Sequence, residues 1–203
     1  MNVFSERVQS RAERRRISRE KVLAAAERLF REQGFDATTV RQIAAEAGLS
    51  SGSVMAVGDK QGLLVAIFDG WIDAVHQERD RGRSEQPSAD AVDAVDHVIG
   101  LIEPFLEYFA RDLELSREYA ATIVRGRHES AIFLNLGLTL IGEIQQLLSR
   151  AGHDEDQAGG AARAIYFAYL GILMTMSNGA LPEDVGRQQF RDVVSLIVNR
   201  PEK

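Results

Sequence analysis

The fold of this chain is constrained most by residues 40–57, which read VRQIAAEAGLSSGSVMAV. Their apolar spacing predicts two short helices that cross through a tight turn, with packing positions at Ile43, Ala47, Leu49, Val54 and Val57. Gly48 supplies the backbone freedom for the turn, and a side chain larger than that of Ala44 would push the helices apart. The pattern is typical of a helix-turn-helix that holds one helix against DNA, although the same geometry also occurs as plain packing in all-helical proteins.

Composition narrows the setting of this motif. With 203 residues, of which 45% are hydrophobic, the chain can bury a sizeable core as one or two domains. It has no cysteine, so neither a disulfide framework nor a thiolate metal site is expected, and its charged start lacks the apolar core of a signal peptide. The longest apolar stretch, residues 164–176, is broken by Gly171 and is shorter than the ~20 residues of a membrane span. We therefore expect a soluble cytoplasmic protein with no membrane partner.

The formal net charge of -6 hides an uneven distribution. Residues 1–60 carry 11 Lys and Arg against 8 Asp and Glu, whereas residues 61–203 carry 13 against 22. A basic arm ahead of a helix-turn-helix, joined to an acidic body, is a plausible electrostatic footprint for phosphate binding, although a solvated tail has the same composition. The basic charge is concentrated in Arg7, Arg11, Arg14, Arg15, Arg16, Arg19 and Lys21.

The hydrophobic periodicity is helical throughout and predicts an all-α fold. A first helix is expected from about Ser18 to Glu32, ended by Gly34, and Thr39 with Gln42 forms a capping box that begins the helix-turn-helix. Asp59 can cap a longer helix, which the charged stretch 79–88 interrupts. Further helices are expected near residues 89–111, 114–125, 128–151, 155–178 and 183–199, with Pro182 in the first turn of the last.

Residues 17–54, which read ISREKVLAAAERLFREQGFDATTVRQIAAEAGLSSGSV, resemble the amino-terminal domain of the tetracycline-repressor (TetR) family of bacterial transcriptional regulators. The resemblance covers roughly residues 17–68, while the rest of the chain agrees with the family only in length and helical pattern. It implies a basic arm (1–17), a three-helix helix-turn-helix DNA-binding domain (18–62) and a helical-bundle regulatory and dimerisation domain (63–203). The matching features are the Ala25-Ala26 pair, Leu29-Phe30, Gly34-Phe35, Thr38-Thr39, Ile43-Ala44, Ala47-Gly48, Lys60 and Leu63-Leu64.

The resemblance also implies which residues contact a double-stranded DNA operator. The helix after the turn, residues 50–57, would enter the major groove, while a helix amino terminus and a nearby lysine would bind phosphate. On the groove helix the candidates are Ser50, Ser51, Ser53 and Met55. Outside it they are Thr38, Thr39, Arg41, Gln42 and Lys60.

The groove helix departs from the family in its chemistry. Met55 stands where many members have a tyrosine that touches phosphate, and the loop before Lys60 looks one residue shorter. The helix also has no Arg, Asn or Gln, the side chains that read guanine and adenine with two hydrogen bonds. Sequence reading is therefore expected to depend on Arg41, Gln42, serine hydroxyls, methyl contacts or the arginines of the arm.

For the carboxy-terminal part, the resemblance implies a homodimer and an unidentified small-molecule effector whose binding releases a palindromic operator from this repressor. Apolar stripes on the last two helices would form the dimer interface, or else only the monomer's core; they comprise Ile165, Tyr166, Ala168, Tyr169, Ile172 and Leu173, followed by Phe190, Val193, Val194 and Ile197. An effector cavity would be lined by Trp71, Phe105, Tyr108, Phe109, Ile132, Phe133, Leu136 and Met174. Its polar anchors would come from Arg125, His128, Glu129, Asn135 and Thr139.

Two rival classes of function stay open. The four histidines lie far apart in sequence, and neither a metalloprotease motif, a nucleophile elbow nor a phosphate-binding glycine loop occurs, so no enzyme, cofactor or metal is expected. The other rival is a helical ligand-binding or interaction module whose helix-turn-helix does not bind DNA. Steeply salt-dependent binding of a palindromic duplex would favour the regulator.

Overall fold

The computed structural model of this protein describes residues 3–83, 94–126, 128 and 130–199, without the side chains of residues 3–10, 80–83 and 131–134. Helix α1, Val3–Gln33, carries the amino-terminal three-helix module. Its buried positions recur every three to four residues, so one stripe of the helix faces α2 and α3. That stripe consists of Val22, Ala25, Ala26 and Phe30.

Helices α2, Val40–Ala47, and α3, Ser51–Met55, form the helix-turn-helix. The predicted capping box is confirmed: the side chain of Thr39 accepts a hydrogen bond from the backbone N–H of Gln42, and the Gln42 side chain accepts one from the backbone N–H of Thr39. Gly48 ends α2 in the left-handed conformation, with φ of 65°, as the turn requires. Ile43, Ala44 and Val54 are buried where the helices meet, which confirms the predicted packing positions at these residues.

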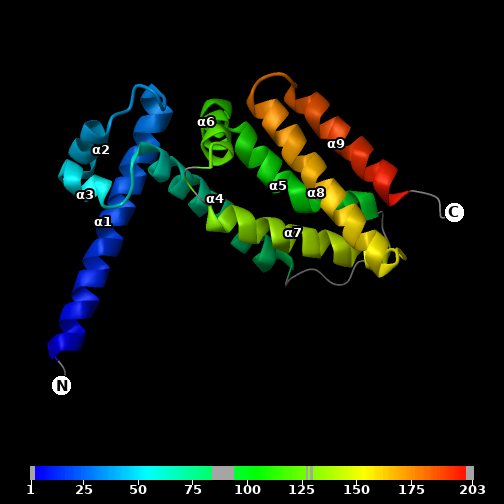
Figure 1. The fold of residues 1–203 in the computed structure, drawn as a ribbon, viewed down its shortest axis with the longest axis horizontal. Helices are drawn as coiled ribbons and strands as arrows, with labels where there is room; N and C mark the ends of the chain where they lie inside the picture. Colours follow the sequence, from blue (N-terminus) through cyan, green and yellow to red (C-terminus); the bar gives the residue numbers. More distant parts are fainter. Residues whose placement is uncertain (1–2, 84–93, 127, 129, 200–203) are drawn as a thin grey trace. The chain divides into compact units, whose positions relative to one another are not determined.

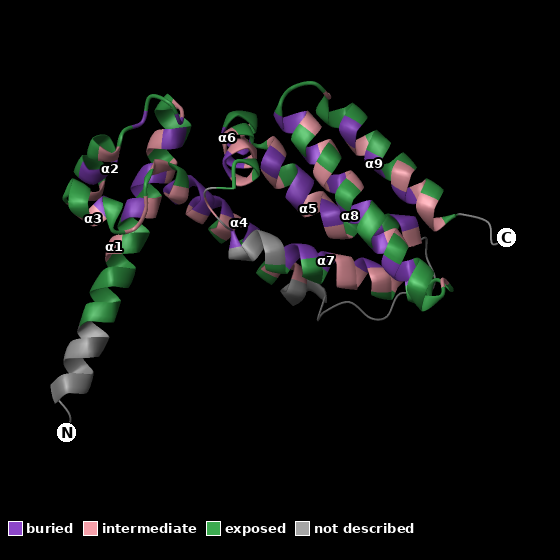
Figure 2. Ribbon diagram, viewed as in Figure 1, coloured by how far each residue is buried: buried purple, intermediate pink, exposed green. Residues whose placement is uncertain are grey.

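Helix α4, Lys60–Arg83, completes the core of this module with its first turns. Asp59 caps it, because the Asp59 carboxylate accepts a hydrogen bond from the backbone N–H of Gly62 at 2.7 Å. The buried residues of α1 to α4 are coloured purple on the ribbon in Figure 2. Those that α4 contributes are Leu63, Leu64, Val65, Ile67 and Phe68.

A second group of helices is built around α8. Helix α8 packs against both α7 and α9, and α5 packs against all three, as Figure 1 shows. The buried side chains of α5 and α8 recur at helical spacing and fill the space between these helices. The helices of the second group are α5 (Ala94–Ala110), α6 (Leu113–Val124), α7 (Ala131–Arg150), α8 (Glu155–Ser177) and α9 (Glu183–Val198).

The all-α fold is confirmed, but three local expectations were wrong. Helix α1 begins at Val3 instead of Ser18, so the basic arm is helical from that residue onward. Helix α4 continues to Arg83 because residues 79–83, although charged, contain no helix-terminating proline; residues 84–88 of the expected break lie outside the described residues. Pro182 is the N-cap of α9 and lies just before its first turn.

The chain divides into two compact units, and each includes a discontinuous segment. The amino-terminal unit comprises Met1–Phe68 with Ala121–Glu129, and the other comprises Asp69–Ala120 with Ser130–Lys203. The expected domain boundary at residue 62 falls inside α4, which runs from the first unit into the second. None of the helices in the described part of the chain is long and apolar enough to cross a membrane.

Packing of α7 on α8 predicts opposite effects for two glycines of α7. A Cβ atom at Gly137 would lie 2.5 Å from the hydroxyl oxygen and 2.9 Å from Cζ of the buried Tyr166, so Gly137→Ala is expected to destabilise the fold by about 1–3 kcal/mol. A Cβ atom at Gly142 would meet nothing within 4 Å, and Gly142→Ala should stabilise α7 by up to about 1 kcal/mol. Thermal unfolding followed by circular dichroism measures both; equal shifts would contradict the close α7–α8 contact.

Candidate functional site

The exposed face of the helix-turn-helix presents few side chains that are free to bind. On α3, Val54 is buried, whereas Ser51 and Met55 point outward, and 53% of the Met55 surface is exposed. Neither Ser51 nor Met55 has a hydrogen-bond partner among the described residues. These two residues are therefore available for a hydroxyl contact and a methyl contact, respectively.

The other two serines of this segment bind each other. Ser50 is the N-cap of α3, and its hydroxyl oxygen accepts a hydrogen bond from the backbone N–H of Ser53 at 3.1 Å. The hydroxyl oxygens of Ser50 and Ser53 lie 2.9 Å apart, so one donates to the other. A DNA contact by either hydroxyl has to share or replace this bond.

On α2, Arg41 is free and its neighbour Gln42 is not. Arg41 is exposed and has no hydrogen-bond or ion-pair partner among the described residues. The Gln42 side-chain oxygen accepts hydrogen bonds from the backbone N–H and the hydroxyl of Thr39, each at 2.8 Å. Since Gln42 and Thr39 complete the cap of α2, reading a base with the Gln42 oxygen would cost that cap.

Thr38 corrects one expectation from the sequence. Its side chain is only 1% exposed, so the structure contradicts a direct contact of this side chain with DNA. The Thr38 hydroxyl donates to the backbone carbonyl of Gly34 at 2.8 Å or of Leu29 at 3.2 Å, and it accepts a hydrogen bond from the Gln33 side chain. Thr38 thus holds the end of α1 against the start of α2.

Lys60 is tied to the loop between α1 and α2. Its ammonium group donates to the backbone carbonyls of Phe35, at 2.9 Å, and Asp36, at 3.4 Å. It also lies 4.2 Å from the centre of the Phe35 ring, within the range of a cation–π contact. An ammonium has three N–H donors, so one stays available for phosphate while the other two hold the loop.

The second unit contains an apolar cavity of about 20 Å³, which has room for about one water molecule. Three of the residues predicted to line an effector cavity do line it: Phe105, Phe109 and Leu136. Burial raises the pKa of the Tyr166 and Tyr169 phenols in its wall, so both stay neutral hydrogen-bond donors at physiological pH. The described residues that line it are Ile72, Phe105, Phe109, Leu136, Leu140, Tyr166 and Tyr169.

None of the other predicted ligand residues that the structure describes lines this cavity. Met174 and Asn135 are exposed, which contradicts a place for either in a closed apolar cavity. The rings of Trp71 and Tyr108 pack on each other, with centroids 4.8 Å apart. Arg125, also predicted as a ligand residue, is exposed. The Nε2 atom of His128 lies 3.4 Å from Oδ1 of Asp59. The side chain of Phe133 lies outside the described residues. Of the remaining expectations, the Ile132 side chain and Glu129 also lie outside the described residues, and Thr139 is exposed and bonds the Asn135 carbonyl.

The sequence analysis missed a buried ion pair in the same unit. Arg79, assigned to an interrupted stretch, pairs with Glu143, and their side chains are 12% and 11% exposed. The Arg79 guanidinium also lies 5.5 Å from the centre of the Phe105 ring. Ile72 and Arg79 are seven residues apart on α4 and share one helix face, so this spacing could have indicated that Arg79 points inward, but not that Glu143 is its partner.

The apolar stripes proposed for a dimer are mostly monomer core. Ile165, Tyr166, Tyr169, Leu173, Phe190 and Val194 are buried within the chain itself. A different row of α8 is exposed, and its members follow at alternating intervals of four and three residues. That row consists of Gly160, Ala164, Phe167, Gly171 and Met174.

Comparison with known proteins identifies the amino-terminal module. Residues 22–67 match the model of the family described as bacterial regulatory proteins, tetR family. No curated protein sequence matches the chain. Among solved structures, a TetR transcriptional regulator from Rhodococcus sp. RHA1 is similar with a TM-score of 0.62 and 19% identity, over 94% of this chain and 99% of that one. Residues 22–67 are therefore similar to the amino-terminal domain of the tetR family.

Two further solved structures extend the likeness in fold over both units of the chain. FadR of Thermus thermophilus, a TetR-family transcriptional repressor in complex with lauroyl-CoA, has a TM-score of 0.66 and 20% identity, over 91% of this chain and 96% of that one. BioQ with its natural double-stranded DNA operator has a TM-score of 0.58 and 18% identity, over 89% and 95%. At these identities the likeness shows a shared fold that extends well beyond the matched residues.

The role assigned to Thr38 in the TetR module predicts a loss of stability. Thr38→Val keeps the volume but removes a buried hydroxyl and leaves the Gln33 amide without its acceptor, so the free energy of unfolding should fall by about 1–3 kcal/mol. Denaturant unfolding measures this change, with Ser51→Ala as a control because Ser51 is exposed and without a partner. Unchanged stability of Thr38→Val would mean that the hydroxyl does not hold α1 to α2.

Proposed function

We propose that this chain is a DNA-binding transcriptional repressor that leaves its operator when a small apolar molecule binds the second unit. The observation that carries this proposal is the helix-turn-helix of a TetR-type module, on whose outer face the side chains of Arg41, Ser51 and Met55 are exposed and bind no other described residue. The solved complex of BioQ with double-stranded DNA supports it, because BioQ shares this fold over most of the chain.

The free side chains favour a limited reading of bases. Arg41 can donate two hydrogen bonds to one guanine, which discriminates by about 1–3 kcal/mol. Ser51 offers one hydroxyl, and Met55 offers a methyl contact to thymine. Two pairs of polar side chains are already bonded within the module, Thr39 with Gln42 and Ser50 with Ser53. We therefore assign these residues first to holding α2 and α3 in place and second to DNA contacts.

We propose a homodimer that forms through the exposed row of α8, and the composition of this row supports it. Phe167 and Met174 are 64% and 42% exposed, and the small residues between and beside them allow a second helix to approach closely. Leu196 on α9 is 76% exposed and adds apolar surface. Two copies related by a two-fold axis would present two recognition helices to successive turns of a palindromic operator.

The effector is proposed to enter the cavity walled by Phe105, Phe109 and Tyr166. FadR, which shares this fold, is in complex with lauroyl-CoA, and the cavity here is similarly suited to an apolar group because its lining is apolar and aromatic. A volume of about 20 Å³ holds no such group, so binding requires the lining helices to separate. That rearrangement would lower operator affinity by the coupling free energy, typically about 1–3 kcal/mol.

Selection of bound fragments from genomic DNA is the experiment that tests the proposal. The full-length protein is mixed with fragmented genomic DNA, and recovered fragments are compared with the input and titrated at several salt concentrations. A repressor should enrich a palindrome and bind it with an affinity that falls steeply with salt. Absence of any enriched fragment would instead favour a helical module that does not bind DNA.

Arg41 and Ser53 should differ in their effects on DNA binding. Arg41→Ala is expected to weaken binding of the enriched duplex by about 1–3 kcal/mol, because this free guanidinium would lose its base contact. Ser53→Ala should have the smaller effect, because the Ser53 hydroxyl is already bonded to Ser50. Gel-shift titrations at one fixed salt concentration measure both, and equal losses would remove the argument.

Phe167 and Leu138 provide a matched test of the dimer. Both are exposed apolar side chains, at 64% and 71%, but Phe167 lies in the proposed interface on α8 and Leu138 on α7 does not. Phe167→Asp should convert the dimer to a monomer, because a carboxylate would be buried against apolar surface, while Leu138→Asp should stay dimeric. Sedimentation velocity measures the two states. A dimer that survives Phe167→Asp would place the interface elsewhere.

A further inference from the structure

Helix α1 extends well beyond the core of the amino-terminal module. Among the residues of α1 whose side chains are described, 11–33, the first buried one is Val22, whereas Arg11 lies eleven residues, or three turns, earlier in the same helix. At a rise of about 1.5 Å per residue, the segment from Arg11 to Val22 spans about 16 Å. The packing of the three-helix module does not account for a helical extension of this length.

The free basic residues of this extension lie on the side of α1 that faces α2 and α3. Residues seven or eleven apart share a helix face, because these intervals correspond to nearly whole numbers of turns. Arg15 stands seven residues before Val22 and eleven before Ala26, and Arg11 stands eleven before Val22. Since Val22 and Ala26 are buried against the module, the two arginines project from the same face beyond its edge.

Two further arginines join this face. Arg14 lies eleven residues before the buried Ala25, and Arg19 lies eleven before the buried Phe30. All four are exposed, and none has an ion-pair partner among the described residues. The overhang is thus a continuous, unneutralised basic surface, which consists of Arg11, Arg14, Arg15 and Arg19.

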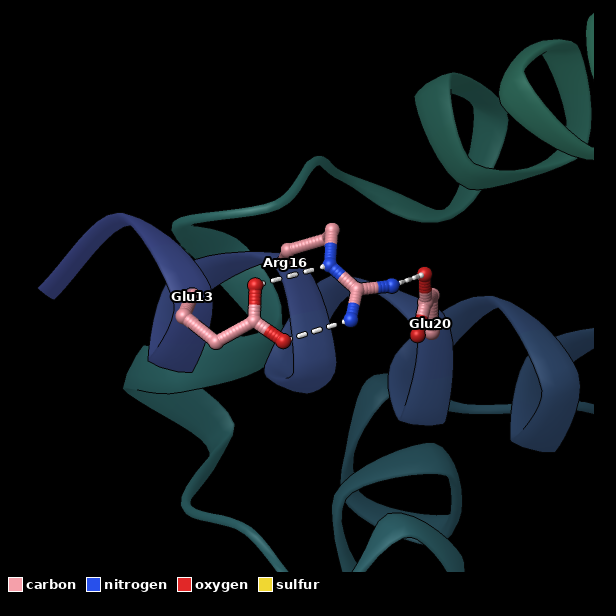
Figure 3. A network of polar contacts seen from close by, with 3 residues as sticks. All are labelled: Glu13, Arg16 and Glu20. Atoms are coloured by element: carbon pink, nitrogen blue, oxygen red, sulfur yellow. Dashed lines mark hydrogen bonds and ion pairs between the residues drawn. The ribbon is translucent and has the colours of Figure 1, made fainter. Parts of the chain in front are cut away.

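Arg16 lies on a different face, and its charge is neutralised. Its guanidinium donates two hydrogen bonds to Glu13, at 2.6 and 3.1 Å, and one to Glu20 at 2.6 Å, as Figure 3 shows. The hydrogen bonds and charge of Arg16 lower the pKa of the Glu13 carboxyl, so Glu13 stays ionised at physiological pH. Acidic residues therefore occupy the face away from the module and leave the module side basic.

We propose that the overhang of α1 is a rigid phosphate-binding arm that lies along the operator duplex outside the half-site read by α2 and α3. This inference rests on the proposed DNA-binding function and adds to it a longer footprint. Arginines on a preformed helix bind phosphates without first ordering a flexible tail. Because phosphates carry no base identity, the contacts would raise affinity without changing the sequence that is read.

The dimensions and chemistry of the arm favour duplex DNA over other polyanions. The length of about 16 Å corresponds to about five base pairs of B-DNA at 3.4 Å per pair. The basic face continues the stripe of α1 that packs on α2 and α3, so it begins at the edge of the helix-turn-helix in the same unit. A membrane-binding helix would carry an apolar face beside its basic one. Between Arg11 and Arg19 the only apolar residues are Ala12 and Ile17, which are too few for such a face.

The test compares two adjacent arginines in the full-length protein. Arg15→Gln and Arg16→Gln each remove one positive charge and keep a good helix former, but only Arg15 belongs to the basic surface. Binding of the enriched duplex is titrated between about 50 and 200 mM salt. Arg15→Gln should make the slope of log affinity against log salt shallower by about 1.8, because each of the two copies on the duplex loses one phosphate contact, and Arg16→Gln should leave it nearly unchanged.

A triple variant and a trimmed duplex complete the design. Replacement of Arg11, Arg14 and Arg15 by Gln should make the slope shallower by about five units, because the two copies together lose six phosphate contacts, while the order of preference among base-substituted operators is preserved. Removing about five flanking base pairs from each end should weaken the wild type and leave the triple variant unaffected.

Three results would overturn the arm. They are equal slopes for Arg15→Gln and the wild type, equal losses for Arg15→Gln and Arg16→Gln, and an affinity of the wild type that does not depend on the flanks. Binding of the triple variant and wild type to anionic phospholipid vesicles is measured in parallel, and a loss confined to vesicles would assign the surface to membranes. Failure of the wild type to prefer any duplex would instead reject the proposed function itself.

Discussion

The position of the helix-turn-helix depends on the contact between Lys60 and the loop at Phe35. Phe35 is buried and packs on Phe30 of α1, with ring centroids 5.1 Å apart. The Lys60 ammonium lies over the Phe35 ring and donates hydrogen bonds to the backbone carbonyls of the loop. Residues that are 25 positions apart in sequence are thereby held together, and α2 and α3 lie between them in the chain. The outer face of the module is displayed only because these contacts fix its two ends.

Hydrogen bonds within the module explain why so few of its polar side chains are free. Thr38, Thr39 and Gln42 satisfy one another or nearby backbone groups, and Ser50 and Ser53 share a hydrogen bond. Polar groups at helix ends are bound in this way because the first turn of a helix has backbone N–H groups without partners. The free side chains are left to carry sequence recognition, and the basic overhang of α1 supplies affinity that does not depend on the bases.

In the second unit, burial separates residues that the sequence pattern had grouped together. Tyr166 and Phe167 are adjacent, yet the first is in the wall of the cavity and the second is exposed on the proposed dimer face. Arg79 and Glu143, far apart in sequence, form a pair shielded from water above Phe105. Core, cavity and interface thus occupy different faces of the same helices.

The sequence alone determined the all-α class, the helix-turn-helix, its Gly48 turn and its capping box, because these depend on local periodicity and on hydrogen bonds three residues apart. Tertiary structure decided which hydroxyl and amide groups are free, that Thr38 is buried, and which face of α8 is exposed. It also decided that α1 begins at Val3, since exposed arginines do not reveal whether they stand on a helix or in a tail. The exposure of a side chain depends on neighbours that are distant in sequence, so it cannot be read from a local sequence pattern.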